Sequence, residues 1–284
     1  MKKRIKGFLG IVLLLAMVAA IMPKQLVNAS NEEDMGLQES SREYLIEVGT
    51  PPEVVDKLSD TAVNNIYTQL IEQAGEGMVV EFGDYGEQVF PISDTSNPGV
   101  QLFSTISSDT LKLSITWYNL KQGNIITQVD AYANYCWLSN PFFCRTDSLI
   151  FNWNSDLFSL SSFYSYDLLV GPTQYYLTNQ QTRPSQANIG GVGWYAELGI
   201  YAVGMGEWGG NPNHVEGGAT LRFIPRYTIT TSSGITGQFA MSYVHNKGGI
   251  GTSVNFSFSG ASIGISATGS YDDAATTSSY YSSK

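Results

Sequence analysis

The sequence has 284 residues, of which 43% are hydrophobic and 14% charged, and it contains 29 glycines and 17 tyrosines. This composition excludes wholesale disorder, a collagen and a long coiled coil. The formal net charge is −10 and no basic cluster occurs after the first 29 residues, so we expect neither nucleic acid nor an anionic membrane surface as a partner.

Residues 1–29 have the features of a secretory signal peptide. A basic start precedes a 14-residue apolar run from Phe8 to Ile21, which is too short to cross ~30 Å of hydrocarbon as a helix. Small side chains at Val27 and Ala29 suit cleavage before Ser30. We therefore expect a secreted, extracellular protein with no stable membrane anchor, and an uncleaved anchor is the alternative.

Residues 30–75 are predicted to form an acidic helical segment. Gly49 ends one helical pattern, and the following Thr50-Pro51-Pro52-Glu53 supplies an N-cap, a proline in the first turn and a carboxylate at the capping-box position. Two or three short helices are expected, and each must pack on another element because helices this short are marginal alone. Removal of the signal, which carries five basic residues and no acids, changes the net charge to −15.

Residues 76–109 are rich in glycine, proline and acids, and we interpret them as a linker that contains one strand, Met78 to Phe82. From Leu111 onward the hydrophobic period becomes two, which is typical of half-buried strands. Many such strands without helical patterns between them predict a mainly β fold, an antiparallel β-sandwich or barrel-like domain over 110–269 with a short α-helical N-terminal segment. Residues 270–284 are predicted to be a flexible tail.

The two cysteines, Cys136 and Cys144, both follow the predicted signal. In an oxidising compartment such a pair is most simply a structural disulfide. The spacing is not that of a redox-active CxxC motif.

One predicted strand carries a candidate binding surface. If Val192, Trp194 and Ala196 face the core, then Tyr195, Glu197 and Tyr201 face outward, and the strand over 125–135 offers a similar outward set that includes Asp130 and Tyr132. Aromatic rings beside acceptor side chains suit sugar recognition, because a ring covers the apolar face of a pyranose while carboxylates accept its hydroxyl hydrogens. The alternative is that these residues are ordinary exposed strand residues.

The sequence contains few candidate catalytic residues, and no motif indicates a cofactor. Both histidines, His214 and His245, are interpreted as ordinary surface or strand-end residues. His214 and Glu216 would share one side of a strand, but a metal site there would be weak and lacks a visible third ligand, so no metal site is expected. The Gly-, Ser-, Thr- and Tyr-rich composition is similar to that of the small jelly-roll xylanases. This resemblance implies two facing glutamates in a cleft, and Glu197 and Glu207 are the pair it points to, although that family's motifs do not surround them.

The last feature is a C-terminal pair of strands. Val254, Phe256 and Phe258 alternate with small polar residues, and after a Ser-Gly turn Ile263 and Ile265 do the same. Such a hairpin suits insertion into a bilayer as part of an oligomeric pore. The alternative is the last hairpin of a soluble sandwich, which needs the same pattern.

These observations favour a non-enzymatic protein of the extracellular space that binds an unknown carbohydrate or protein ligand. The alternatives are a membrane-active, pore-forming hairpin protein and a jelly-roll glycoside hydrolase. No cofactor is expected for any of the three.

Overall fold

A computed structural model describes residues 31–75, 77–87, 104–139, 146–170, 175–197, 214–259 and 262–283. The chain divides into two compact units, Met1–Glu39 and Ser40–Lys284. Helix α2 (Asn31–Glu47) begins in the first unit, while α3 (Pro52–Val55), α4 (Asp60–Gln73) and all strands belong to the second. None of the described helices is both long and apolar enough to span a membrane.

Local sequence signals account for the helix boundaries. Gly49 follows α2 with a φ of 99°, a left-handed conformation that favours glycine. Pro52 lies in the first turn of α3. The hydroxyl of Ser59 caps α4 by accepting a hydrogen bond from the Ala62 N–H at 3.2 Å. The predicted N-terminal helical segment is therefore confirmed.

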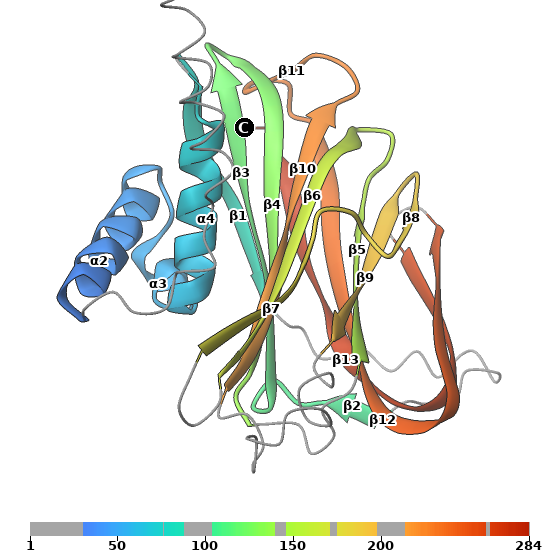
Figure 1. Cartoon of the computed structure of the whole chain (residues 1–284). Coiled ribbons are helices and arrows are strands. Elements are labelled where there is room, and N and C mark those ends of the chain that lie inside the picture. Colours follow the sequence, from blue (N-terminus) through green and yellow to red (C-terminus); the bar gives the residue numbers. More distant parts are fainter. Residues whose placement is uncertain are drawn as a thin grey trace, which may run out of the picture. The chain divides into compact units, whose positions relative to one another are not determined.

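The strands form two sheets, and the predicted antiparallel, sandwich-like β fold is confirmed (Figure 1). The first sheet has the order β1-β3-β4-β10-β6-β7, with β11 paired to β4. Its strands are β1 (Val79–Glu87), β3 (Leu111–Gln122), β4 (Ile125–Trp137), β6 (Phe158–Val170), β7 (Tyr175–Gln181), β10 (His214–Pro225) and β11 (Ile229–Thr230).

The second sheet has the order β2-β13-β12-β5-β9-β8. All its pairings are antiparallel except that of β13 with β2. Its strands are β2 (Ser104–Ile106), β5 (Thr146–Trp153), β8 (Gln186–Asn188), β9 (Gly191–Glu197), β12 (Thr236–Ser259) and β13 (Ser262–Ser282).

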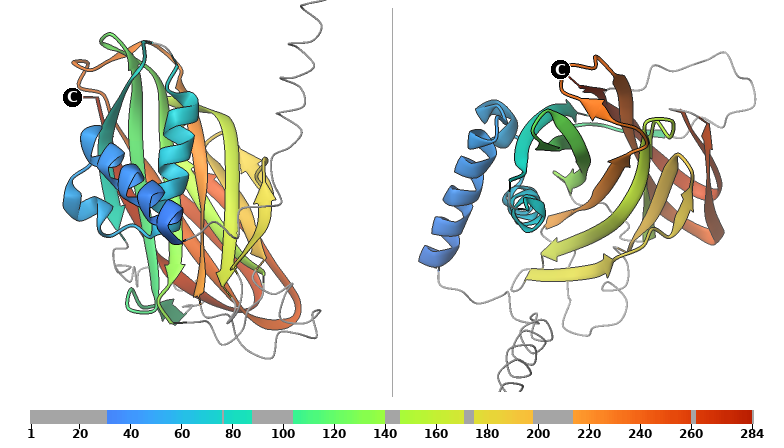
Figure 2. Two further views of the ribbon diagram at one scale, coloured as in Figure 1. Left: turned by 60° about the vertical axis from the view of Figure 1, so that its left-hand side comes forward. Right: turned by 90° about the horizontal axis from the view of Figure 1, so that it is seen from above.

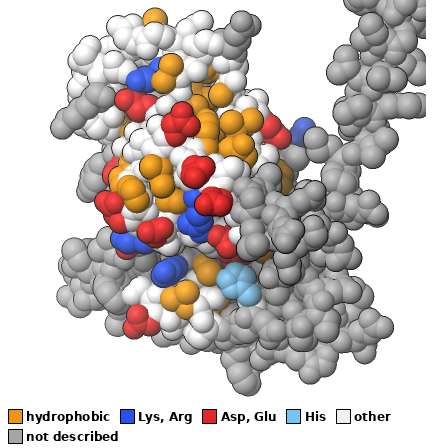
Figure 3. Space-filling model, turned by 90° about the vertical axis from the view of Figure 1, so that its left-hand side faces the viewer, with side chains coloured by type: hydrophobic (Ala, Val, Ile, Leu, Met, Phe, Trp, Pro, Cys, Tyr) orange, Lys and Arg blue, Asp and Glu red, His pale blue; other side chains and the backbone are white. Residues whose placement is uncertain are grey.

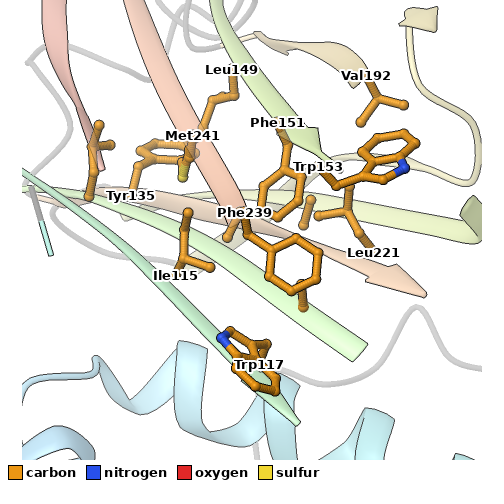
Figure 4. Packing of buried hydrophobic residues seen from close by; sticks show 14 of the residues in the cluster. Ile115, Trp117, Tyr135, Leu149, Phe151, Trp153, Val192, Leu221, Phe239 and Met241 are labelled. Atoms are coloured by element: carbon orange, nitrogen blue, oxygen red, sulfur yellow. The ribbon is translucent and has the colours of Figure 1, made fainter. Parts of the chain in front are cut away.

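Aromatic and aliphatic side chains from both sheets fill the space between them (Figure 4). Phe151 of the second sheet stacks on Phe223 of the first, with ring centroids 6.2 Å apart, and Phe239 stacks on Phe223 at 5.4 Å. These positions follow the period of two that is visible in the sequence, because alternate residues of a strand share one face.

A second cluster of buried residues lies on the outer face of the first sheet, under the helices (Figure 2). Ile66 and Leu70 of α4 pack there with Tyr118, Leu120 and Tyr132 of β3 and β4. Asn65 of α4 also donates a hydrogen bond to Thr220 of β10 at 3.3 Å. Helix α4 is therefore part of the second unit and covers one face of the first sheet.

Two segments differ from their predicted boundaries. Strand β1 extends to Glu87, beyond the strand predicted at Met78 to Phe82. Strand β13 continues to Ser282 through residues for which a flexible tail is predicted, and the Ser283 N–H donates to the Ile235 carbonyl at 3.0 Å. The reason is that β12 pairs with Tyr271–Ala274 and Thr277–Ser282 of this stretch, which composition alone does not reveal.

Candidate functional site

The structure describes part of the strand, β9, for which a binding surface is predicted. Val192, Trp194 and Ala196 are fully buried between the sheets, as predicted. Tyr195 lies on the opposite face, where it is half-buried and its hydroxyl accepts a hydrogen bond from Gln186 Nε2 at 2.8 Å. Glu197 ends the strand opposite Thr146, while its side chain and Tyr201, with Glu207, lie outside the described residues.

The predicted exposure of Asp130 and Tyr132 is wrong, since both are fully buried. Tyr132 packs in the cluster under α4. Asp130 accepts hydrogen bonds from Arg222 at 3.0 Å and from Gln128 at 2.8 Å. Burial raises the pKa of the Asp130 carboxyl, while the bonds from Arg222 act against that rise. Alternation in the sequence shows that these residues point away from the inner core, but it does not show what covers them.

A buried polar cluster, made of Asp147, Tyr243, His245 and Trp137, joins the two sheets and was not predicted. Asp147 accepts hydrogen bonds from the Tyr243 hydroxyl and from the Asn246 N–H at 2.9 Å, and it lies 2.9 Å from His245 Nδ1. Trp137 Nε1 of the first sheet donates to the Tyr243 hydroxyl of the second at 3.0 Å.

The interpretation of His245 as an ordinary strand-end residue is wrong, since the residue is 5% exposed and bound to a carboxylate. Burial raises the pKa of the Asp147 carboxyl, and His245 and the other donors oppose this. The sequence does contain a signal for the cluster. Phe239 and Met241 of β12 face the inner core. Tyr243 and His245 follow at the same spacing of two residues, so the sequence places them on the same face.

Cys136 lies on β4 next to His214 and Glu216 of β10. The sequence alone shows His214 and Glu216 as two potential metal ligands but does not show a third. No disulfide partner of Cys136 is present among the described residues, and Cys144 lies outside them, so the Cys136–Cys144 disulfide stays a prediction. Burial and the neighbouring Glu216 carboxylate raise the pKa of the Cys136 thiol to about 11.

The two strands of the predicted C-terminal hairpin do pair with each other. Seven consecutive pairs run from Ser253↔Thr268 to Ser259↔Ser262, and we name this stretch the distal hairpin. Pairing with β5 is confined to Phe239–Val244 of β12, and pairing with β2 to Asp272–Ala274 of β13. In the described part of the chain, the distal hairpin therefore has no third strand beside it, and Figure 1 shows β12 and β13 curving at the lower edge of the sheets.

The register of the distal hairpin places its apolar positions opposite one another. Phe256 pairs with Ile265 and Phe258 with Ile263, while Val254 pairs with Ala267. The intervening pairs combine serine, threonine, asparagine and glycine. Because directly opposed residues share a face of an antiparallel pair, one face of this ribbon consists of apolar positions and the other of uncharged polar positions.

Comparison with known proteins gives no family for this chain. No protein-family model matches the sequence, and no curated protein matches it. Among solved structures, a similar chain is described by the words "AvmM Catalyzes Macrocyclization in Alchivemycin A Biosynthesis", with 12% identity, 64% of this chain and 95% of that chain covered, and a TM-score of 0.25. A similarity this low carries no argument, so function must be inferred from the residues themselves.

Proposed function

We propose that the exported protein is membrane-active and that the distal hairpin is the segment that enters the bilayer, in an oligomeric pore built from several copies. The observation that carries the proposal is the register, which sets the apolar positions of the two strands against each other in one row. A strand pair in a pore wall needs this arrangement, since one face meets lipid and the other meets water.

The dimensions of the distal hairpin support the proposal. Seven residue pairs at a rise of ~3.3 Å give a ribbon of about 23 Å. Strands of a membrane barrel tilt by ~35–45°, so the ribbon would reach across roughly 16–19 Å, most of an apolar band that is ~25 Å tall. No charged residue occurs between Ser253 and Thr268, so insertion requires no charge to enter hydrocarbon.

The strand arrangement also supports the proposal. An isolated two-stranded ribbon is marginally stable in water, and the distal hairpin has no third described strand beside it. Neighbouring hairpins in a pore would supply the missing strand partners and hydrogen bonds. The sandwich would remain folded, because its inner core involves the other end of β12 and β13.

Dye release from phosphatidylcholine vesicles tests the proposal with protein lacking residues 1–29. Phe256 is the fourth residue of the seven on its strand, so Phe256→Asp places a charge in the middle of the apolar row. We expect release by the wild type and a loss of at least tenfold in Phe256→Asp, because a carboxylate facing lipid is costly.

Ser257→Asp is the matched control, since it adds the same charge one residue away on the polar face. It should retain release, while Ile265→Asp, opposite Phe256, should behave like Phe256→Asp. Circular dichroism of each variant in solution checks that the fold is intact. Absence of release at every wild-type concentration, or an equal loss in Phe256→Asp and Ser257→Asp, would refute the proposal.

A further inference from the structure

Cys136, near the C-terminal end of β4, lies close to His214 and Glu216, at the N-terminal end of β10. Glu216 pairs in register with Cys136, and His214 lies two residues before Glu216, on the same side of β10. One potential ligand atom from each of the three side chains lies within 4.8 Å of the other two. Sequence spacing alone predicts the His214–Glu216 pair, and the neighbouring strand adds the thiol.

The separations in this cluster suit a tetrahedral metal ion. His214 Nε2 lies 3.3 Å from Glu216 Oε2. Two ligands held at ~2.0–2.1 Å from a tetrahedral zinc ion are about 3.3 Å apart, and a thiolate at ~2.3 Å lies slightly farther from each. The 3.3 Å separation of His214 Nε2 and Glu216 Oε2 therefore matches two adjacent ligands of such an ion, and the Cys136 thiol lies within 4.8 Å of both.

Neighbouring groups hold one of the ligands in place. The hydroxyl-bearing residues Ser59 and Thr61, at the start of α4, lie close to the Glu216 carboxylate. That side chain is only 4% exposed, whereas the His214 side chain is 37% exposed. The exposed His214 side chain leaves the cluster accessible to an ion from solvent. Figure 3 shows the helix-bearing face of the molecule, on which acidic, basic and apolar side chains lie together.

We propose that Cys136, His214 and Glu216 bind a divalent zinc-type ion, with water completing its coordination. Thiolate, imidazole and carboxylate are the ligand set that Zn²⁺ takes in proteins, whereas Mg²⁺ and Ca²⁺ prefer oxygen ligands. Binding releases the thiol proton, because the thiolate is the form that ligates the metal. The site therefore requires reduced Cys136 and competes with the predicted disulfide to Cys144.

Cobalt titration of the reduced, processed chain tests the proposal, since Co²⁺ occupies zinc sites and a bound thiolate gives a near-ultraviolet charge-transfer band. We expect one Co²⁺ per chain with that band, which Zn²⁺ should abolish. Cys136→Ser should lose the band. His214→Gln and Glu216→Gln should each weaken Co²⁺ binding at least tenfold, because each removes one of the three ligands.

Cys144→Ser is the matched control, because it removes the competing disulfide and leaves all three ligands. It should bind Co²⁺ with the same band, even without reductant. Circular dichroism confirms that each variant is folded. Absence of the band in both the reduced wild type and Cys144→Ser, or its survival in Cys136→Ser, would overturn the proposal.

Discussion

Trp117 lies directly against the backbone at Gly83, where a β-bulge interrupts the pairing of β1 with β3. A Cβ atom at Gly83 would lie 2.0 Å from carbons of the indole ring. The same indole donates a hydrogen bond to Ser279 of β13, which in turn donates to Asp84. One glycine therefore allows a tryptophan to connect the two sheets.

We expect Gly83→Ala to lower the free energy of unfolding by about 1–3 kcal/mol, the range for overpacking a tight site. Urea unfolding measures this change. Gly75→Ala is the control, because its nearest neighbour, the Met78 sulfur, would lie 3.6 Å away, an ordinary contact. Equal stability of the two variants would show that Trp117 moves without cost.

The buried cluster around Asp147 supports a second prediction at the residue scale. Asp147→Ala leaves the Tyr243 hydroxyl and the Asn246 N–H without their acceptor in a fully buried site. We expect a loss of about 3–5 kcal/mol, the range for breaking a buried charged network. Asp147→Asn keeps the shape and one acceptor oxygen, so its loss should be smaller.

Thermal or urea unfolding of the two Asp147 variants distinguishes these outcomes. A loss below about 1 kcal/mol in Asp147→Ala would mean that water replaces the carboxylate, because water-bridged groups cost little.

At the scale of elements, α4 and the outer face of the first sheet form a second core. The sequence supplies both halves of it, since α4 has an apolar stripe and large residues such as Tyr118, Leu120 and Tyr132 occupy the face that alternation assigns to the outside. The apolar face of each helix or strand predicts only that this face is buried against some other element. Neither pattern says which element the other covers, so the contact and the burial of Tyr132 were not predicted.

Ile66→Ala tests whether this second core belongs to the cooperative fold. Ile66 is fully buried in α4, so its truncation should cost about 2–5 kcal/mol. Ile71, in the same helix, is 48% exposed, and Ile71→Ala should change stability by less than about 0.5 kcal/mol.

The measurement for these variants is urea unfolding followed by tryptophan fluorescence, because Trp117, Trp153 and Trp194 lie in the inner core. A shifted midpoint in Ile66→Ala shows that helices and sheets unfold together. An unshifted fluorescence transition, with a separate early loss of helix, would contradict the prediction.

At the scale of the whole molecule, most of the acidic residues and the distal hairpin lie in different parts of the chain. Residues 31–94 contain 15 acidic residues against two basic ones, whereas residues 253–268 contain no charge. Attraction to a bilayer must therefore come from the apolar row alone, and an anionic surface repels the rest of the molecule.

This separation predicts that dye release is slower from vesicles containing phosphatidylglycerol than from pure phosphatidylcholine vesicles at low salt. The difference should shrink as salt rises, because the Debye length falls from ~30 Å at 0.01 M to ~8 Å at 0.15 M. Faster release from the anionic vesicles would contradict the prediction.

The amino-acid sequence by itself determines the class of fold, the inward rows of the strands and the two faces of the C-terminal hairpin. These are properties of single elements, because periodicity records which side of a strand or helix is apolar. Only the tertiary structure decides that α4 covers Tyr132, that Asp147 meets His245, and that Cys136 joins His214 and Glu216. Each of these contacts joins elements that are distant in sequence. The packing of the two cores brings these elements together, and no local sequence pattern records that packing.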